Sequence, residues 1–280
     1  MRTASFGPAG IQVSVIGQGT WNLERADERA ALAALEAGLA AGMMHIDTAE
    51  LYGGGRAEQI VGRAIAGRRD EVFLVSKVLP TNASYAKTLA ACERTLQQLA
   101  TDYLDVYLLH WRGGTPLEET FRAFDKLIAE GKIKAFGVSN FDVDDLEEAV
   151  AIVGSGRIAC NQVLYHLTER SIEHRVIPWC RQHGIAVVAY SPFGSGNFPS
   201  AQSAGGKALA KIADARGVSA YQIALAFLVQ QGEAFAIPKA ASVAHARDNA
   251  AAGDLALDAA ENRAIDTAFP IQRRRGLAMI

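Results

Sequence analysis

The feature that most constrains this chain is a regular alternation of short apolar runs with longer amphipathic segments. The apolar runs are typical of buried strands, and the segments between them repeat their apolar residues every three or four positions, as helices do. The expected strands are 15–17, 43–48, 72–78, 103–111, 133–138, 158–165, 185–190 and 234–237. The expected helices are 27–41, 56–67, 84–100, 116–130, 142–153, 170–183, 206–216, 219–231, 242–252 and 258–268.

Strands that are apolar on both faces and separated by helices predict a parallel sheet covered by those helices. Eight strand–helix units favour a closed barrel over an open sheet. The open sheet with a dinucleotide fingerprint is weaker, because Asn22 stands where the third glycine after Gly17 and Gly19 would be needed. The predicted fold class is therefore α/β. We expect one (β/α)8 TIM barrel over residues 1–280, with an N-terminal β-hairpin within 2–14 and two extra helices.

Composition narrows the class of function. Lysine plus arginine (28) and aspartate plus glutamate (30) give a net charge of −2, so neither nucleic acid nor an anionic membrane is expected as a partner. Arg273–Arg275 is interpreted as a solvated tail or an anchor for an acidic side chain. The three cysteines lack the spacing of metal ligands, so no metal is expected. With no signal peptide evident and no apolar run of spanning length, we expect a soluble, cytoplasmic protein. A monomer is expected, although an oligomer stays possible.

Four chemically active side chains fall at or just after consecutive strand ends. Asp47 ends the second strand and Tyr52 follows it, Lys77 ends the third strand, and His110 lies at the end of the fourth. Catalytic groups of such barrels sit at the carboxyl ends of the strands. Alternation along the strands lets Asp47, Lys77 and His110 all point into the barrel mouth. A buried lysine needs a partner, and Asp47 can supply it. We therefore expect one active site built from these four residues.

This set of residues suits proton donation by the phenol. A tyrosine ionises near pH 10, and an ammonium beside it is expected to lower that pKa. Asp47 would keep Lys77 charged, and His110 would orient a substrate oxygen or relay a proton. Tyr52 would then act as general acid toward a carbonyl oxygen whose carbon receives a hydride. A structural role is expected for His45, which points inward below Asp47.

Seven motifs in sequence resemble the aldo-keto reductase family over nearly the whole length. The first is Ile46-Asp47-Thr48-Ala49-x-x-Tyr52-Gly53, followed by Glu58 and Gly62. The others are Ser76-Lys77, Leu109-His110-Trp111, Gly137-Val138-Ser139-Asn140-Phe141, Asn161-Gln162-x-x-Tyr165-His166, Ala189-Tyr190-Ser191-Pro192 and Ile237-Pro238-Lys239.

The resemblance implies reduction of an aldehyde or ketone to an alcohol by NAD(P)H, without a metal. The family tetrad maps onto Asp47, Tyr52, Lys77 and His110. The substrate mouth would be lined by Trp21 and Trp111 together with Tyr52 and His110, which favours apolar or aromatic carbonyl compounds. The implied cofactor contacts are Gly19, Thr20, Asp47, Ser139, Asn140, Gln162, Tyr190, Ser191, Gly194, Lys239, His245, Asp248 and Asn249, with Tyr190 stacked on the nicotinamide.

Two departures from the family pattern limit what the resemblance implies. Many NADPH-preferring members have a serine after the lysine and an arginine six residues on, where this chain has Ala240 and His245. NADP(H) is therefore favoured only moderately over NAD(H). The C-terminus, 273–280, is brief where longer members cover the substrate, so we expect an open pocket with weak affinity for small substrates.

Two other functions stay open from the sequence. The first is a Schiff-base aldolase with Lys77 as the nucleophile. The second is a regulatory or sensor subunit that binds NADP(H) and turns over little substrate. The physiological substrate and the direction of the reaction do not follow from the sequence.

Overall fold

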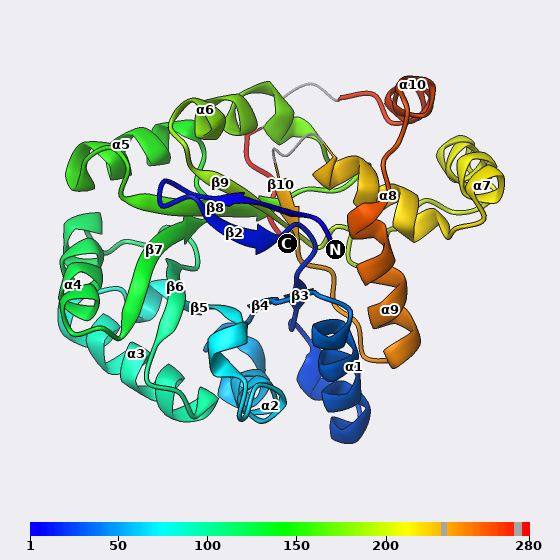
Figure 1. Cartoon of the computed structure of the whole chain (residues 1–280). Coiled ribbons are helices and arrows are strands. Elements are labelled where there is room, and N and C mark those ends of the chain that lie inside the picture. Colours follow the sequence, from blue (N-terminus) through cyan, green and yellow to red (C-terminus); the bar gives the residue numbers. More distant parts are fainter. Residues whose placement is uncertain (231–233, 272–275) are drawn as a thin grey trace.

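The strands form a parallel barrel, shown in Figure 1. The computed structural model describes residues 1–230, 234–271 and 276–280. In this part of the chain, eight strands pair in chain order, each parallel to the next. They are β3 (Gln18–Gly19), β4 (His45–Asp47), β5 (Phe73–Val78), β6 (Leu104–Leu109), β7 (Ile133–Ser139), β8 (Ile158–Leu164), β9 (Ala186–Tyr190) and β10 (Ala234–Ala236).

Backbone contacts between the first and last strands close the sheet. Ile16 and Ala236 form a parallel bridge, as do Gly19 and Lys239. The Gly17 amide donates to the Ala236 carbonyl at 2.8 Å. The predicted (β/α)8 barrel is confirmed. The predicted first strand, 15–17, was placed too early, because Val15–Gly17 bonds across this seam whereas Gln18 and Gly19 pair with β4.

Helices surround the barrel, close to where the periodicity placed them. They are α1 (Glu28–Ala40), α2 (Arg56–Ala64), α3 (Tyr85–Leu99), α4 (Leu117–Ala129), α5 (Val143–Val153), α6 (Val176–Gln182), α7 (Ala204–Arg216), α8 (Ala220–Val229), α9 (Val243–Ala251) and α10 (Ala259–Ala268). The extra helices α7 and α10 lie outside the ring (Figure 1). The last residue of the predicted helix 219–231 and the basic run 273–275 lie outside the described residues.

One helix differs clearly from its prediction. The segment 170–183 was expected to be a single helix, but Ser171–His174 is a short 3-10 turn and α6 begins only at Val176. Pro178 explains the late start, since proline has no amide hydrogen and fits only within the first turn of a helix.

The predicted hairpin closes one end of the barrel. Strands β1 (Thr3–Phe6) and β2 (Ile11–Ser14) are antiparallel and cross that end in Figure 1. Phe6 is 3% exposed, and its ring lies 4.9 Å from the rings of both Phe73 and Phe235. Phe6 and Val13 belong to the apolar cluster that fills the barrel interior, together with Val75, Val106 and Leu108. The interior below the strand ends is thus a packed core.

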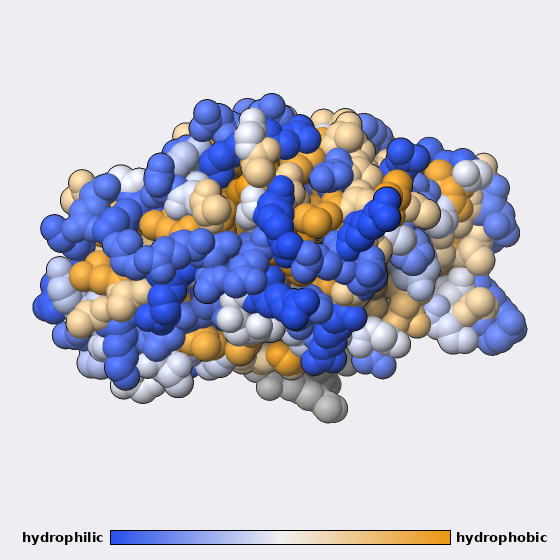
Figure 2. All heavy atoms as spheres, turned by 90° about the horizontal axis from the view of Figure 1, so that it is seen from below, coloured by the Kyte–Doolittle hydropathy of each residue, from blue (hydrophilic) through white to orange (hydrophobic). Residues whose placement is uncertain are grey.

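The outer surface is mainly polar. Figure 2 shows one side of the molecule with hydrophilic residues over most of it and hydrophobic residues in small separate patches. Among the described residues, no single helix is long and apolar enough to span a membrane. Helices α7 and α8 pass that test only as a pair, and the chain bends by 96° between them.

Candidate active site

A buried ion pair lies at the carboxyl ends of β4 and β5. The Lys77 ammonium donates to Asp47 Oδ1 at 2.5 Å and to the Thr48 carbonyl at 2.9 Å. Its third contact is the Tyr52 hydroxyl, at 3.2 Å. Asp47 and Lys77 are 1% and 0% exposed, so each charge depends on the other and on these hydrogen bonds. The structure therefore brings together acid, amine and phenol as the sequence predicted.

The local sequence explains how these groups meet. In β5, Val75 points into the barrel core and so does Lys77 two residues on, while Ser76 between them faces α2. After Tyr52 the chain turns through Gly53, Gly54 and Gly55, whose φ angles are 59°, 62° and 93°. Side chains rarely adopt this left-handed backbone, and a Cβ at Gly53 would also lie 2.5 Å from Glu24. The glycine run thus allows the sharp turn that directs Tyr52 inward.

Burial changes the acidities in this cluster. It raises the pKa of the Tyr52 phenol, and although Lys77 opposes the rise, the net direction is upward. The expectation that the phenol pKa falls is therefore wrong for the free protein, because the loss of water outweighs the nearby ammonium. Burial also raises the pKa of Asp47, opposed by Lys77 and Gln162. Burial lowers the pKa of Lys77, but Asp47 and Tyr52 more than offset this and raise it. Tyr52 is protonated and Lys77 charged at neutral pH.

The two inward histidines are both neutral. Burial and the Lys77 charge lower the pKa of His110 to about 2 and that of His45 to about 3. The His110 ring lies 5.8 Å from the Tyr52 ring, edge to face, so it borders the phenol as predicted. His45 lies deeper, with its ring nearly perpendicular to the rings of Phe6 and Phe73 at centroid distances of 5.8 and 5.5 Å. Its ring nitrogens have no hydrogen-bond partner among the described residues, which agrees with a packing role.

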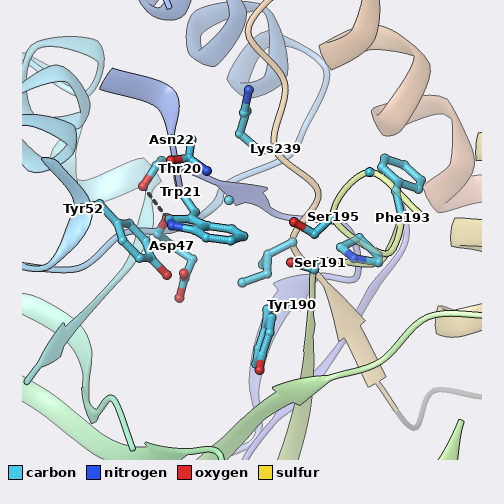
Figure 3. Close-up of a pocket in the computed structure, with 14 residues that line it drawn as sticks. Thr20, Trp21, Asn22, Asp47, Tyr52, Tyr190, Ser191, Phe193, Ser195 and Lys239 are labelled. Atoms are coloured by element: carbon cyan, nitrogen blue, oxygen red, sulfur yellow. Dashed lines mark hydrogen bonds between the residues drawn. The ribbon is translucent and has the colours of Figure 1, made fainter. Parts of the chain in front are cut away.

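A pocket of about 340 Å³ opens on one side of Tyr52. In Figure 3, Asp47 and Tyr52 lie on one side of this pocket, and Tyr190, Ser191 and Phe193 lie on the other. The Thr20 hydroxyl donates a hydrogen bond to the backbone carbonyl of Asp47 at 2.9 Å, drawn as a dashed line in Figure 3. The lining includes predicted cofactor contacts from four strand ends: Gly19, Thr20, Asp47, Tyr190, Ser191 and Lys239.

A smaller pocket of about 160 Å³ also borders the phenol. All four predicted substrate contacts line it: Trp21, Tyr52, His110 and Trp111. Leu51, Met279 and Ile280 line it too, and sequence reasoning missed them. The last residues of the brief C-terminal segment reach the mouth of this pocket but are themselves exposed, so the expectation of an open pocket stays a prediction. Trp21, Tyr52 and Tyr190 line both pockets, so the two spaces meet at the phenol.

Polar groups from β7, β8 and β9 face the second pocket and bond to one another. The Gln162 amide donates to Asp47 Oδ2 at 2.7 Å, and the Ser139 hydroxyl donates to the Gln162 carbonyl at 2.8 Å. The Tyr190 hydroxyl donates to Asn140 Oδ1 at 2.9 Å. All four line this pocket, beside the phenol. The network leaves them ordered where a flat amide-bearing ring could be held.

The other predicted cofactor contacts lie farther from the phenol. Gly194 is in the loop after β9, but its neighbours Phe193, Ser195 and Gly196 line the larger pocket instead. His245, Asp248 and Asn249 are on α9 and line neither pocket. Asp248 accepts a hydrogen bond from Ser219 at 2.8 Å. The loop residues carried no signal in the sequence beyond glycine and serine content, which is common to most loops.

No cluster of three or more His, Cys, Asp or Glu side chains that could hold a metal occurs within residues 1–230, 234–271 and 276–280. The three cysteines are each buried as free thiols. The expectation that the reaction needs no metal stays a prediction.

Comparison with known proteins agrees with this geometry. The profile of the Aldo/keto reductase family matches residues 15–269. Methylglyoxal reductase YeaE of Escherichia coli (strain K12) is 44% identical over 262 residues, which cover 93% of this chain and 92% of the relative. Glyoxal reductase of Bacillus subtilis (strain 168) is 34% identical over 262 residues, which cover 92% and 89%.

A solved structure is equally similar. The aldo-keto reductase from Klebsiella pneumoniae in complex with NADPH superposes with a TM-score of 0.93 and 44% identity, covering 100% of this chain and 99% of that one. The predicted resemblance and the predicted reaction class, carbonyl reduction with NADP(H), are confirmed at the level of the family. The chain belongs to the aldo/keto reductase family.

Proposed function

We propose that this chain reduces small aldehydes and ketones to alcohols with NADPH, and that Tyr52 is the proton donor. The observation that carries the proposal is the Lys77 ammonium, held 2.5 Å from Asp47 and 3.2 Å from the Tyr52 hydroxyl, where two pockets meet. One pocket is large enough for part of a dinucleotide, and the other suits a small carbonyl compound.

The larger pocket fits a nicotinamide dinucleotide. Its volume of about 340 Å³ lies in the range of natural ligand sites, and it ends at the phenol. The loop after β9 borders it with backbone at positive φ: 48° at Ser191, 50° at Ser195 and 94° at Gly196. Such a loop exposes amide hydrogens and hydroxyls suited to phosphate oxygens. Lys239 adds a cation at the pocket edge, where Figure 3 shows its side chain directed away from Tyr52.

Each member of the tetrad has a separate role. A nicotinamide cofactor in the larger pocket, held by groups such as Tyr190 and Ser191, would supply a hydride to the carbonyl carbon. Tyr52 gives its proton to the carbonyl oxygen as that oxygen gains charge, and the charge left on the phenolate is stabilised by the Lys77 ammonium. Asp47 keeps the ammonium in place. His110 is neutral, so it serves to orient the carbonyl oxygen and adds no second proton. Solvent then returns a proton to Tyr52.

The smaller pocket limits the substrate. Pockets for drug-sized ligands start at roughly 300 Å³, whereas this one is about 160 Å³ and would also receive the nicotinamide amide beside Ser139, Asn140 and Gln162, which leaves room only for a small carbonyl compound. Its walls are mainly apolar or aromatic, with Trp21, Trp111 and Ile280 among them. Two of the relatives are named methylglyoxal reductase and glyoxal reductase. We therefore assign small aldehydes, and oxoaldehydes of two or three carbons first, as the substrate class.

NADPH is proposed over NADH. A relative structure binds NADPH, and Lys239 supplies one cation for the 2′-phosphate. His245, in the place of the family arginine, is exposed near the start of α9. The preference for NADPH therefore depends mainly on Lys239. We expect it to be weaker than in family members that have both the lysine and the arginine.

The aldolase alternative is disfavoured by the state of Lys77. A Schiff-base lysine attacks as the neutral amine, which requires a lowered pKa. Here the pKa of Lys77 is raised and the amine is fully buried in an ion pair. The sensor alternative is disfavoured by the intact contacts between Asp47, Lys77 and Tyr52, since a cofactor sensor would not need a proton donor.

Three measurements test the proposal. Fluorescence titration with NADPH and NADH gives the two dissociation constants, and loss of NADPH absorbance with glyoxal, methylglyoxal and longer aldehydes gives kcat and KM. Tyr52→Phe is expected to lower kcat by a factor on the order of 10² to 10⁴ while NADPH binds within about threefold of wild type. Unchanged turnover by Tyr52→Phe would contradict the assignment of the proton donor. Absence of turnover across the panel by the wild type would contradict carbonyl reduction.

A further inference from the structure

Two glutamates that take no part in the chemistry reach the strand that carries Lys77. The first is Glu58, in the first turn of α2 just after the glycine run. It is 1% exposed, and its Oε1 accepts a hydrogen bond of 2.7 Å from the Ser76 hydroxyl. Ser76 is the neighbour of Lys77 on β5 and faces the opposite way. This bond therefore ties the far end of the Tyr52 loop to the back of β5.

The second is Glu50, two residues before Tyr52. Its Oε1 accepts from the Leu79 amide at 2.7 Å and from the Asn82 side chain at 3.0 Å. Its own amide donates to the Lys77 carbonyl at 3.4 Å. The side chain is 13% exposed. Glu50 thus ties the near end of the same loop to the segment that follows β5, and Arg94 lies 3.5 Å from its outer oxygen.

Between these two anchors the loop is held by its own short 3-10 turn, in which the Tyr52 and Gly54 amides donate to the Ala49 and Leu51 carbonyls at 3.0 and 3.3 Å, and by the contacts of the Tyr52 side chain. It runs from Leu51 to Gly55, and its three glycines at positive φ have no side chains to pack. Leu51 is 44% exposed. The hydroxyl of Tyr52 nevertheless has to stay within 3.2 Å of Lys77. A glycine-rich segment loses more entropy on ordering than others, so its position depends on the contacts at its ends.

We propose that Glu50 and Glu58 are positioning residues that clamp both ends of the Tyr52 loop to β5 and its following segment, and so hold the phenol against Lys77. This inference rests on the proposed function of Tyr52 as proton donor. It goes beyond it by assigning the distance between phenol and ammonium to two side chains that touch neither substrate nor cofactor pocket.

For Glu58 the hydrogen bond matters more than the charge. Burial raises the pKa of the Glu58 carboxyl, and the bond from Ser76 opposes that rise. The charged groups that face it are Glu50 and Lys77, of opposite sign. A glutamine at this place keeps an oxygen that accepts from Ser76, whereas a leucine keeps only the bulk. The pair Glu58→Gln and Glu58→Leu therefore separates hydrogen bonding from simple filling of space.

The first measurement is steady-state kinetics with methylglyoxal and NADPH. Glu58→Leu and Ser76→Ala are expected to lower kcat by roughly 10- to 100-fold, as for a misplaced catalytic group, with KM for both reactants within about threefold. Glu58→Gln is expected within about twofold of wild type. Glu50→Leu should behave like Glu58→Leu, since it frees the other end of the loop. The matched control is Tyr165→Phe, which removes a hydroxyl that donates to Glu173 at 2.8 Å on another side of the barrel and should leave kcat unchanged.

The second measurement is independent of turnover. Carbon-13 NMR of protein labelled at tyrosine Cζ, with the Tyr52 signal assigned through Tyr52→Phe, gives the pKa of the phenol directly. Glu58→Leu is expected to raise that pKa above the wild-type value, because the phenol moves away from the ammonium, and Glu58→Gln to leave it unchanged. An unchanged Tyr52 titration in both Glu58→Leu and Glu50→Leu, in protein that is folded by circular dichroism, overturns the inference. If wild type reduces no carbonyl compound, the proposed function fails, yet this titration still decides the positioning role.

Discussion

The two sides of the candidate site are built differently. On the side of β4 and β5, Asp47 and Lys77 are fully buried, each with several hydrogen bonds to groups of the same cluster. On the side of β9 and β10, the pocket is bordered by exposed groups such as Ser195, Gly196 and Lys239. Asp47 and Lys77 are held in place by burial, whereas the side proposed for the cofactor consists of a loop and the solvent-exposed Lys239. Rate should therefore depend on the first side and cofactor choice on the second.

The strongest way to break this contrast is Lys77→Met. Asp47 would be left buried without its cation, which costs about 3–5 kcal/mol of stability, and the phenolate would lose its stabilising charge. We expect kcat to fall by a factor on the order of 10³, with a large loss of unfolding free energy in urea. If the variant kept both its kcat and its stability, the ion pair would not be the centre of the rigid side. Lys239→Met is the control on the opposite side.

The pH dependence of the free energy of unfolding tests the buried side of the site through His45, which lies on β4. Its pKa is about 3 in the folded chain and about 6.5 when unfolded, so the unfolded state binds the proton first. Its contribution to stability is complete above pH 6.5 and declines as pH falls toward 3, by about 1.4 kcal/mol per pH unit. His45→Asn should therefore lose less stability than wild type between pH 7 and pH 5, by about 2 kcal/mol.

Urea unfolding at both pH values measures this difference. The matched control is His245→Asn, on an exposed part of α9, which should follow wild type. An equal pH dependence in His45→Asn and wild type would mean that His45 accepts a proton inside the folded barrel.

A smaller effect is expected on the cofactor side. Lys239→Met removes the cation at the pocket edge, so the dissociation constant for NADPH should rise about tenfold, while that for NADH changes less than about twofold. Because the loop side carries no reacting group, kcat at saturating cofactor should hold. Fluorescence titration with both cofactors gives the answer, and an equal loss for NADH would show that Lys239 does not contact the 2′-phosphate.

The smallest expected effect is a gain. His245→Arg restores a permanent cation at the place where many NADPH-preferring members have one, so NADPH should bind about threefold more tightly. Binding of NADH serves as the internal control and should not change. A tighter fit for both cofactors, or for neither, would mean that residue 245 lies out of reach of the phosphate.

Strand periodicity predicted most of the buried residues of the candidate site. Alternation along β5 was enough to place Lys77 inside the barrel, and the excess cost of burying a lone ammonium pointed to Asp47 as its partner. Tyr52 was inferred from its position in the loop that follows Asp47 at the same strand end. These inferences depend only on local pattern and on the general geometry of parallel barrels.

Properties that depend on three-dimensional surroundings were beyond the sequence. The pKa of Tyr52 rises because many distant segments together exclude water from it, and a sequence does not show that density. The approach of Met279 and Ile280 to the smaller pocket depends on the path of a segment without periodicity. The bonds made by Glu50 join two loops, and loops leave no hydrophobic pattern from which such pairs could be found.

The β1–β2 hairpin, which bears Phe6, closes one end of the barrel. Aldehyde and alcohol must then enter and leave through the opposite, open end of the barrel. The alcohol has to leave before another aldehyde can bind. Because the alcohol leaves from the same pocket that the aldehyde enters, turnover should slow as the alcohol accumulates.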